Sequence, residues 1–396
     1  MTRATGGGSY DYVVVGAGPA GCVVAARLAE DPGTRVLLVE AGGPVRGLFL
    51  RMPAALPYVY QRSSIQWGYQ SGPEPHLGGR SIDEKAGKLV GGSSSINAMI
   101  FNRGNPMDYD GWARLGLPEW SYAHCLPYFR RMETFEDGAD DWRGGEGPLR
   151  VGRNRAEHTL FETSLRSGEQ AGCTVTPDHN GFRQEGLHIA QSFIHVGLRW
   201  NAERAYLRPA LGRPNLELLT GAAAEKVVVD GGRASGVVVS GRGGRRTVVC
   251  DREVVLSAGA YNSPKLLLLS GIGDTGELRR HGIRSSPTCP PSGATWRTTP
   301  ASTSSSPPAT RTRSPRSSAC SAAPGSARAG CSPGRVSAPA TCSRPARSCA
   351  PGTASRTPTC STSSCPSPGG CRAGSSCPYR DSSSGWTCPA RSAGAR

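Results

Sequence analysis

Residues 10–43 read YDYVVVGAGPAGCVVAARLAEDPGTRVLLVEAGG, and the fold class can be inferred from this stretch. The uninterrupted valine run after Tyr12 is typical of a buried parallel strand. The segment from Pro19 to Leu28 has a helical pattern, which a Pro-Gly turn ends. A second apolar run, 36–39, ends at Glu40. The order strand, helix, strand predicts a β-α-β unit, and with it an α/β protein of the Rossmann type.

Three glycines join the first strand to the helix in the spacing G-x-G-x-x-G: Gly16, Gly18 and Gly21. The first two let the backbone turn tightly and approach a pyrophosphate, and the third lets the helix pack on the strand. The anion would lie at the helix N-terminus, on free N–H groups and the positive end of the dipole. Glu40 ends the second strand, where a carboxylate can hold an adenosine ribose hydroxyl. The motif predicts a dinucleotide, leaves FAD and NAD both open, and has a purely structural glycine turn as its alternative.

Two more glycine turns follow, GGSSSIN at 91–97 and Ala258-Gly259 after an apolar strand at 253–256. Adjacent glycines let the backbone approach a cofactor, and serine hydroxyls and the Asn97 amide supply donors and acceptors. Each turn alone is more often an ordinary turn than a site. Three such turns, each beside regular structure, together favour a cofactor site.

The remaining pattern is uneven along the chain. Residues 44–84 form an irregular excursion rich in Pro, Gly and aromatic residues, and residues 108–150 mix aromatic and charged residues in a helical pattern. From 214 to 256, Gly-rich turns separate three or four short alternating strands. We expect a helix to begin near Ser263-Pro264, and the periodicity vanishes beyond Ile283.

Composition changes abruptly at that point. Residues 285–396 contain no Leu, Ile, Met, Phe, Asn, Gln, Glu, His or Lys; they hold 13 Arg and one acid, Asp381. This segment therefore carries +12 of the net charge of +16, so the basic balance says little about the partners of the remaining part. It also holds ten of the 14 cysteines, and the four scattered thiols elsewhere indicate a reducing compartment. There is no CxxC pair and no His after His281, so we expect no metal site.

The first residues show no apolar run followed by a cleavage site, and no segment approaches 18 uninterrupted apolar residues. The sequence predicts a cytoplasmic protein without a membrane span.

Three segments together resemble the glucose–methanol–choline (GMC) oxidoreductases, FAD enzymes that oxidise alcohols. They are residues 11–43, GKLVGGSSSINAMIFNRGNPMDYDGWA at 87–113 and LSAGAYNSPKLLLLSGIGD at 256–274. Within the family, residues 52–60, 73–80 and 117–134 are most similar to choline dehydrogenases. The resemblance runs from about Tyr10 to Ile283. It implies that residues 1–283 form a Rossmann-like FAD-binding region with inserted β strands and part of a discontinuous substrate domain, at about 150–220.

The resemblance also implies a cofactor, FAD, and the residues that hold it. Some members attach FAD covalently through a His at the position of Ile96, so the flavin is expected to be non-covalent here. The glycines of the first motif would cradle the pyrophosphate, Glu40 the ribose, residues 89–90 and 97–100 the flavin, and the Ala224 backbone the adenine side. The full expected set is Gly16, Gly18, Gly21, Glu40, Ala41, Leu89, Val90, Gly92, Ser93, Asn97, Ala98, Met99, Ile100, Ala224, Ala258 and Gly259.

The implied reaction oxidises a primary, choline-like alcohol to the aldehyde by hydride transfer to flavin N5, with a base for the hydroxyl proton. The family places its catalytic His in the C-terminal portion, whereas His281 is the last His of this chain. We assign no catalytic residue and expect surface or core positions for His76, His124, His158, His179, His188 and His195. The chain is therefore expected to bind FAD weakly or not at all and to be inactive. An NAD-dependent dehydrogenase stays open, as do the identity of the alcohol, the electron acceptor and the oligomeric state.

Residues 284–396 have a second interpretation besides a genuine tail. When the codons of residues 288–300, TCPPSGATWRTTP, are read one base earlier, they can give D-L-P-x-V-G-x-N-L-E-D-H-P, a segment typical of the family. Residues 340–351 and 357–366 give family-like segments in the same frame. We interpret residues 284–396 as a low-complexity, disordered, frameshifted translation caused by loss of one C after Ile283. The alternative is a Ser/Arg/Pro-rich tail that binds nucleic acid, which we do not favour as a partner.

Overall fold

The computed structural model describes residues 8–155 and 158–285, all of which belong to one compact unit. The interpretation of the sequence beyond residue 285, as frameshifted and disordered, lies outside the described residues.

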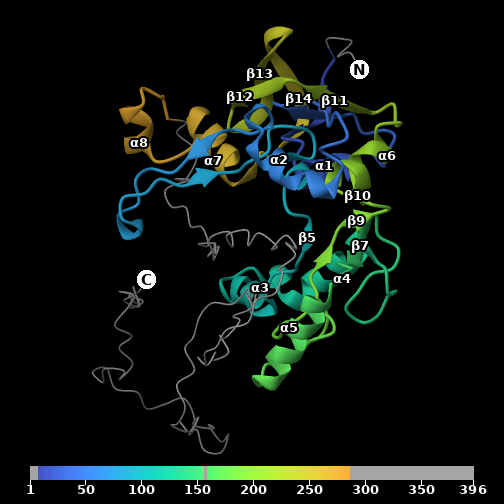
Figure 1. Cartoon of the computed structure of the whole chain (residues 1–396). Coiled ribbons are helices and arrows are strands. Elements are labelled where there is room, and N and C mark those ends of the chain that lie inside the picture. Colours follow the sequence, from blue (N-terminus) through green and yellow to red (C-terminus); the bar gives the residue numbers. More distant parts are fainter. Residues whose placement is uncertain (1–7, 156–157, 286–396) are drawn as a thin grey trace, which may run out of the picture. The chain divides into compact units, whose positions relative to one another are not determined.

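A six-stranded sheet forms the centre of the fold, in the order β11-β2-β1-β14-β13-β12. Figure 1 shows that it joins strands from the start of the chain (blue) with strands from much later (yellow). The first four strands in this order are parallel, and β12, β13 and the first half of β14 form an antiparallel meander. The strands are β1 (Tyr10–Val15), β2 (Val36–Glu40), β11 (Leu216–Thr220), β12 (Ala222–Asp230), β13 (Arg233–Gly241) and β14 (Gly244–Leu256). The expected α/β class with inserted strands is confirmed.

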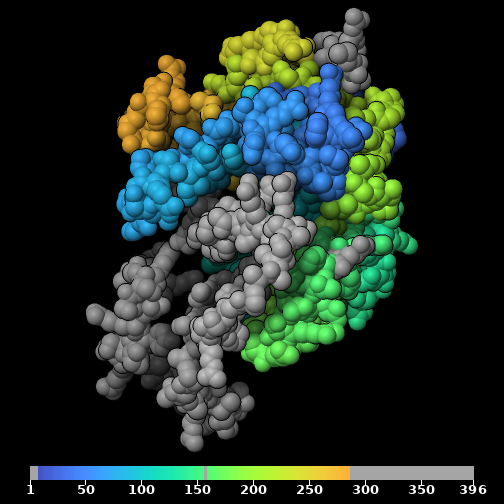
Figure 2. Space-filling view, in the orientation of Figure 1, coloured from blue at the N-terminus to red at the C-terminus, as the bar shows by residue number. Residues whose placement is uncertain are grey.

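β14 links the two kinds of pairing because it is 13 residues long. Its first half pairs with β13, for example Val248 with Val237, and its last residues pair with β1, for example Val254 with Val13. The yellow and blue atoms accordingly adjoin on the surface in Figure 2. The inserted strands β12 and β13 thus continue the parallel sheet to which β1 and β2 belong.

Helix α1 (Pro19–Leu28) covers one face of the sheet with small side chains. Cys22 and Ala25 pack against Val14 and Leu38 in one buried cluster. On the other face Val13 and Leu37 pack with Leu266 of α7 (Gly259–Leu269). Every residue of β2 is buried, as expected of a parallel strand covered on both faces. The helix predicted near Ser263-Pro264 begins earlier, at Gly259, and Ala258 N–H donates to Ser263 Oγ across its first turn.

A separate four-stranded sheet has the order β5-β8-β7-β6 and a small aromatic core that includes Phe101, Phe135 and Phe193. Its strands are β5 (Ile100–Phe101), β6 (Glu133–Phe135), β7 (Leu149–Arg153) and β8 (Gln191–Ser192). The helices nearest to it in the chain are α3 (Pro106–Arg114), η5 (Pro118–Trp120), α4 (Tyr122–Met132) and α5 (Thr159–Gln170). The division into an FAD-binding region and a partial substrate domain at about 150–220 stays a prediction, and β5 and β6 of this sheet lie outside that range.

Short elements complete the described residues. They are η1 (Pro53–Ala55), α2 (Leu56–Gln61), η2 (Ser63–Ile65), β3 (Tyr69–Gln70), η3 (Pro75–Leu77), β4 (Asp83–Glu84), η4 (Gly92–Ser95), β9 (Ile194–His195), β10 (Leu198–Arg199), η6 (Glu203–Leu207), α6 (Arg208–Ala210) and α8 (Thr275–Arg280). No helix within residues 8–155 and 158–285 is both long and apolar enough to cross a membrane.

Candidate functional site: a cavity where three glycine turns meet

A cavity of about 1010 Å³ opens at the carboxyl ends of the parallel strands. Val15 of β1, Val39 of β2 and Leu256 of β14 line it, and so do Gly18 and Pro19 at the N-terminus of α1. In open α/β sheets ligands bind at this edge, and a helix N-terminus beside it favours an anionic group. The position of the cavity is therefore that of a dinucleotide site.

The first glycine turn is required by close packing. Gly16 has φ +97°, and a Cβ atom there would lie 2.6 Å from Ser257 O. A Cβ on Gly21 would lie 1.9 Å from Gly16 O, so a side chain would force α1 away from β1. Gly18 differs, because its Cβ would meet only Ser257 O at 3.8 Å. The protein itself leaves room at Gly18, so the need for glycine there would come from a ligand.

The other two turns lie against the first one. Gly91 N–H donates to Ala17 O over 2.7 Å, and a Cβ on Gly92 would lie 2.8 Å from Gly18 Cα. Ser257 N–H donates to Val15 O over 2.8 Å, which brings the third turn to the end of β1. Three loops far apart in the sequence thus surround one cavity.

Glu40 is buried at the rim of the cavity, where its carboxylate accepts from the first glycine turn and from the loop that follows β2. Its Oε2 accepts from Ala17 N–H over 2.9 Å, and its Oε1 accepts from Gly42 N–H over 2.8 Å. Burial raises the pKa of the Glu40 carboxyl, and the two backbone N–H groups oppose this shift. Each oxygen keeps a further lone pair with which the carboxylate could accept a ribose hydroxyl.

The structure brings nine of the sixteen expected cofactor residues to the cavity wall: Gly16, Gly18, Glu40, Ala41, Gly92, Ser93, Ala224, Ala258 and Gly259. The other seven do not line it: Gly21, Leu89, Val90, Asn97, Ala98, Met99 and Ile100. Gly21 packs against the Gly16 carbonyl, and Leu89, Val90 and Met99 belong to buried apolar clusters.

The stretch from Asn97 to Ile100 is held by a residue that the sequence did not single out. Arg199 is buried and donates from Nη1 to Asn97 O over 2.7 Å and to Asn97 Oδ1 over 2.9 Å. Burial lowers the pKa of Arg199 to about 10. Met99 has a positive φ of 62°, and its N–H donates to Asn97 Oδ1. Asn97 is therefore the point at which this loop is fixed.

An aromatic wall of the cavity also escaped sequence reasoning. Trp67 stacks on Tyr69 with ring centroids 5.9 Å apart, and Tyr69 lies 5.4 Å from Tyr261. Lys85 and Lys265 add positive charge to the same lining. The only available signal was the aromatic content of the irregular excursion, because the contact of Tyr69 with Tyr261 depends on the tertiary fold.

No histidine is among the described residues that line the cavity. Of the six His side chains expected at surface or core positions, His179 is buried and His188 is half-buried. The other four are exposed: His76, His124, His158 and His195.

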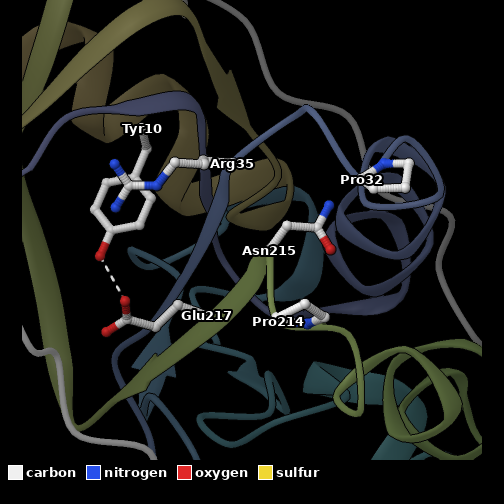
Figure 3. Close-up of a pocket in the computed structure, with 6 residues that line it drawn as sticks. All are labelled: Tyr10, Pro32, Arg35, Pro214, Asn215 and Glu217. Atoms are coloured by element: carbon white, nitrogen blue, oxygen red, sulfur yellow. Dashed lines mark hydrogen bonds between the residues drawn. The ribbon is translucent and has the colours of Figure 1, made fainter.

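A second, smaller cavity of about 280 Å³ lies at the opposite edge, where β1, β2 and β11 begin. Figure 3 shows Tyr10 pointing to Glu217, and its phenol donates to Glu217 Oε2 over 2.6 Å. The Arg35 guanidinium lies over the Tyr10 ring. These contacts join β1 to β11, the edge strand of the sheet. They explain why these polar side chains lie together without a ligand.

The sequence pattern of the family described as GMC oxidoreductase matches residues 10–285. The oxygen-dependent choline dehydrogenase of Sinorhizobium fredii is 47% identical over 274 residues, which are 69% of this chain and 50% of that protein. The enzyme of the same name from Brucella ovis is 46% identical over 273 residues, with the same coverage. The chain thus spans about half the length of the curated relatives it matches.

The comparison with solved structures also finds oxidoreductases that match most of this chain. Pyridoxine 4-oxidase from Mesorbium loti matches with a TM-score of 0.67 and 35% identity, over 70% of this chain and 55% of the other. An FAD-dependent oxidoreductase from Chaetomium thermophilum matches with a TM-score of 0.65 and 31% identity, over 70% and 50%.

Proposed function

The chain belongs to the GMC oxidoreductase family, and we propose that its large cavity holds FAD and that the whole protein oxidises a primary, choline-like alcohol to the aldehyde. The main observation behind the proposal is that three glycine turns meet at the N-terminus of α1 and surround a cavity of about 1010 Å³. This volume is at the upper end of the range of ligand cavities, as a dinucleotide requires. The similarity to choline dehydrogenases supports the choice of substrate.

The residues of this chain suit the parts of FAD in turn. The pyrophosphate would lie on the N–H groups at the start of α1, beside Gly18, where no protein atom needs the space. Glu40 would accept a ribose hydroxyl, and the Ala224 backbone would meet the adenine. Residues 97–100 would lie along the flavin, held in place by Arg199. When bound, the flavin supplies the hydride acceptor for alcohol oxidation.

We also propose that the flavin is bound without a covalent link. Ile96 is buried among Leu50, Val59 and Leu89, and its alkyl side chain offers no nucleophile. Denaturation in acid should therefore release all the FAD into the supernatant.

Turnover by this chain is not expected, because a base for the hydroxyl proton is missing from the described cavity wall. The sequence after His281 contains no histidine to supply one. The choline-type reaction is therefore proposed for a protein of the full length of these relatives, and the electron acceptor stays open.

The deciding experiment is an FAD titration of the chain and of Gly18→Ala, followed by flavin fluorescence. A methyl group at Gly18 fits the protein but would occupy the space of the pyrophosphate, so Gly18→Ala should fold normally and lose at least about tenfold in affinity. Gly72→Ala is the matched control, since a Cβ there meets no atom within 4 Å. Binding of NAD in place of FAD, or equal affinity in Gly18→Ala and Gly72→Ala, would refute the proposal.

A further inference from the structure

A segment outside the cavity wall holds the second glycine turn. Gly92 and Ser93 of this turn line the large cavity, whereas Ser94 and Ser95 are buried and are not among the described residues that line it. The buried serines meet the segment 199–202, which also lies outside the described cavity wall. The turn therefore has one part that faces the space for a ligand and another that rests on the protein.

Arg199 supplies the first set of contacts. Its Nη1 donates to Ser94 O over 3.2 Å, to Asn97 O over 2.7 Å and to Asn97 Oδ1 over 2.9 Å. Asn97 Oδ1 also accepts from the N–H of Met99, whose positive φ of 62° is rare for a long side chain. Such backbone strain persists only where the surroundings hold it, and it gathers at ligand sites. Arg199 is thus part of what keeps this stretch in its strained form.

The charge of Arg199 makes these contacts costly to break. Arg199 is 3% exposed, and within residues 8–155 and 158–285 no ion pair balances it and its Nε has no hydrogen-bond partner. A buried cation needs polar groups around it, and here the oxygens of one loop provide them. Because movement of the loop would leave the guanidinium without these oxygens, the charge locks the loop in place.

Asn201 supplies a second anchor two residues further along. Its Nδ2 donates to Ser95 Oγ over 2.6 Å, and Ser95 Oγ donates to Val90 O over 2.9 Å. A Cβ on Gly91 would lie 2.3 Å from Ser95 Oγ and 3.0 Å from Asn201 Nδ2, so this contact requires glycine there. The two adjacent glycines therefore serve different purposes: Gly91 admits the anchor, and Gly92 lines the cavity.

We propose that Arg199 and Asn201 are positioning residues that preform the second glycine turn for FAD, through side chains that lie outside the cavity wall. The inference rests on the proposed function, because it takes FAD as the ligand of the cavity. A turn that is fixed before the ligand arrives loses less conformational entropy on binding. The affinity for FAD is accordingly set in part from behind the turn.

The test measures the turn and the cofactor separately, in the full 396-residue chain. Hydrogen–deuterium exchange of residues 91–100 is followed without FAD, and the affinity for FAD is followed by flavin fluorescence. Arg199→Met removes the charge and its donors, so we expect at least about tenfold faster exchange and about tenfold weaker binding. Arg199→Lys keeps a cation with several donors on one nitrogen, and it should restore most of both. Arg204→Met is the matched control and should change neither, since the Arg204 guanidinium lies over the Trp200 ring.

Ser95→Ala gives a second variant with little risk to folding, because it removes one oxygen atom and with it the contact to Asn201. It should also speed the exchange and weaken FAD binding. Exchange equal to that of the unsubstituted chain in both Arg199→Met and Ser95→Ala would overturn the proposal, and so would unchanged FAD affinity in both. If the unsubstituted chain binds no FAD, the proposed function fails, and the exchange of residues 91–100 still decides whether Arg199 and Asn201 hold the turn.

Discussion

Arg143 and Glu133 form an ion pair in which neither side chain has exposed surface, with 2.7 Å between Arg143 Nε and Glu133 Oε1. The same Glu133 oxygen accepts from Arg103 Nη2 over 2.9 Å, and Arg143 Nη1 donates to Asp178 Oδ2 over 2.9 Å. Two cations and two anions thus balance inside the part of the chain that carries the four-stranded sheet. The cluster joins Glu133, at the start of β6, to Arg103, Arg143 and Asp178, which all lie in loops.

Glu133→Gln should destabilise the protein by about 3–5 kcal/mol, because it leaves two buried guanidinium groups short of one negative charge. The free energy of unfolding in urea measures the effect. Asp137→Asn is the control: its ion pair with Arg153 is partly exposed, so we expect a change below about 1 kcal/mol. Equal effects of the two substitutions would contradict a balanced buried cluster.

Because His179 is buried with a lowered pKa, we expect the folded protein to lose stability in mild acid. Burial, followed by the neighbouring His188, lowers the pKa of His179 to about 4 from 6.5. The rings stack 3.9 Å apart, and His179 Nε2 meets Phe101 O at 3.2 Å, with Asp178 and Arg143 nearby. Below pH 6.5 the unfolded chain binds a proton that the folded chain does not, so this contribution falls between pH 6.5 and about 4.

Urea unfolding at pH 7 and pH 5 tests this prediction. The group should remove about 2 kcal/mol of stability over that interval in the wild type. His179→Gln should show a correspondingly smaller change with pH, and the exposed His124→Gln should behave as the wild type. If His179→Gln keeps the full pH dependence, the assignment to His179 is wrong.

Tyr10→Phe should weaken the sheet without affecting the cofactor cavity. Burial and the hydrogen bond to Glu217 raise the pKa of Tyr10 to about 12, so the neutral phenol is the form that donates. Loss of a hydrogen bond to a charged acceptor should cost about 1.5–3 kcal/mol of unfolding free energy at pH 7. Tyr58→Phe, at a side chain that is largely exposed, should cost nothing measurable. Unequal FAD affinities of Tyr10→Phe and the wild type would show that the two edges of the sheet are coupled.

The sequence was sufficient for the β1–α1–β2 unit because its signals are local. A valine run, a glycine turn and the period of α1 each involve a few neighbouring residues, and the helix Pro19–Leu28 lies where its pattern predicts. Glu40 could be identified because the motif fixes its distance from the glycines.

The contacts that complete the site could not be predicted in this way. Arg199 reaches Asn97, and Tyr69 reaches Tyr261, across separations that carry no periodic signal. The pairing of β1 with β14 is equally distant in sequence. Such contacts follow only from the tertiary arrangement, which is why the aromatic wall and the Arg199 support were missed while the glycine turns were found.

Insertion of one C after the codon of Ile283 should convert the gene into that of a complete enzyme. The interpretation of residues 284–396 as a shifted frame predicts a family-like sequence with a histidine in the segment read as N-L-E-D-H-P. The restored protein should be yellow, release its flavin in acid, and reduce an artificial electron acceptor in the presence of choline. Insertion of three bases at the same place is the matched control, since it keeps the shifted frame and should leave the protein inactive. If the restored gene gives an insoluble or colourless product while the original chain binds FAD and is active, the frameshift interpretation is wrong and residues 284–396 are a genuine part of the protein.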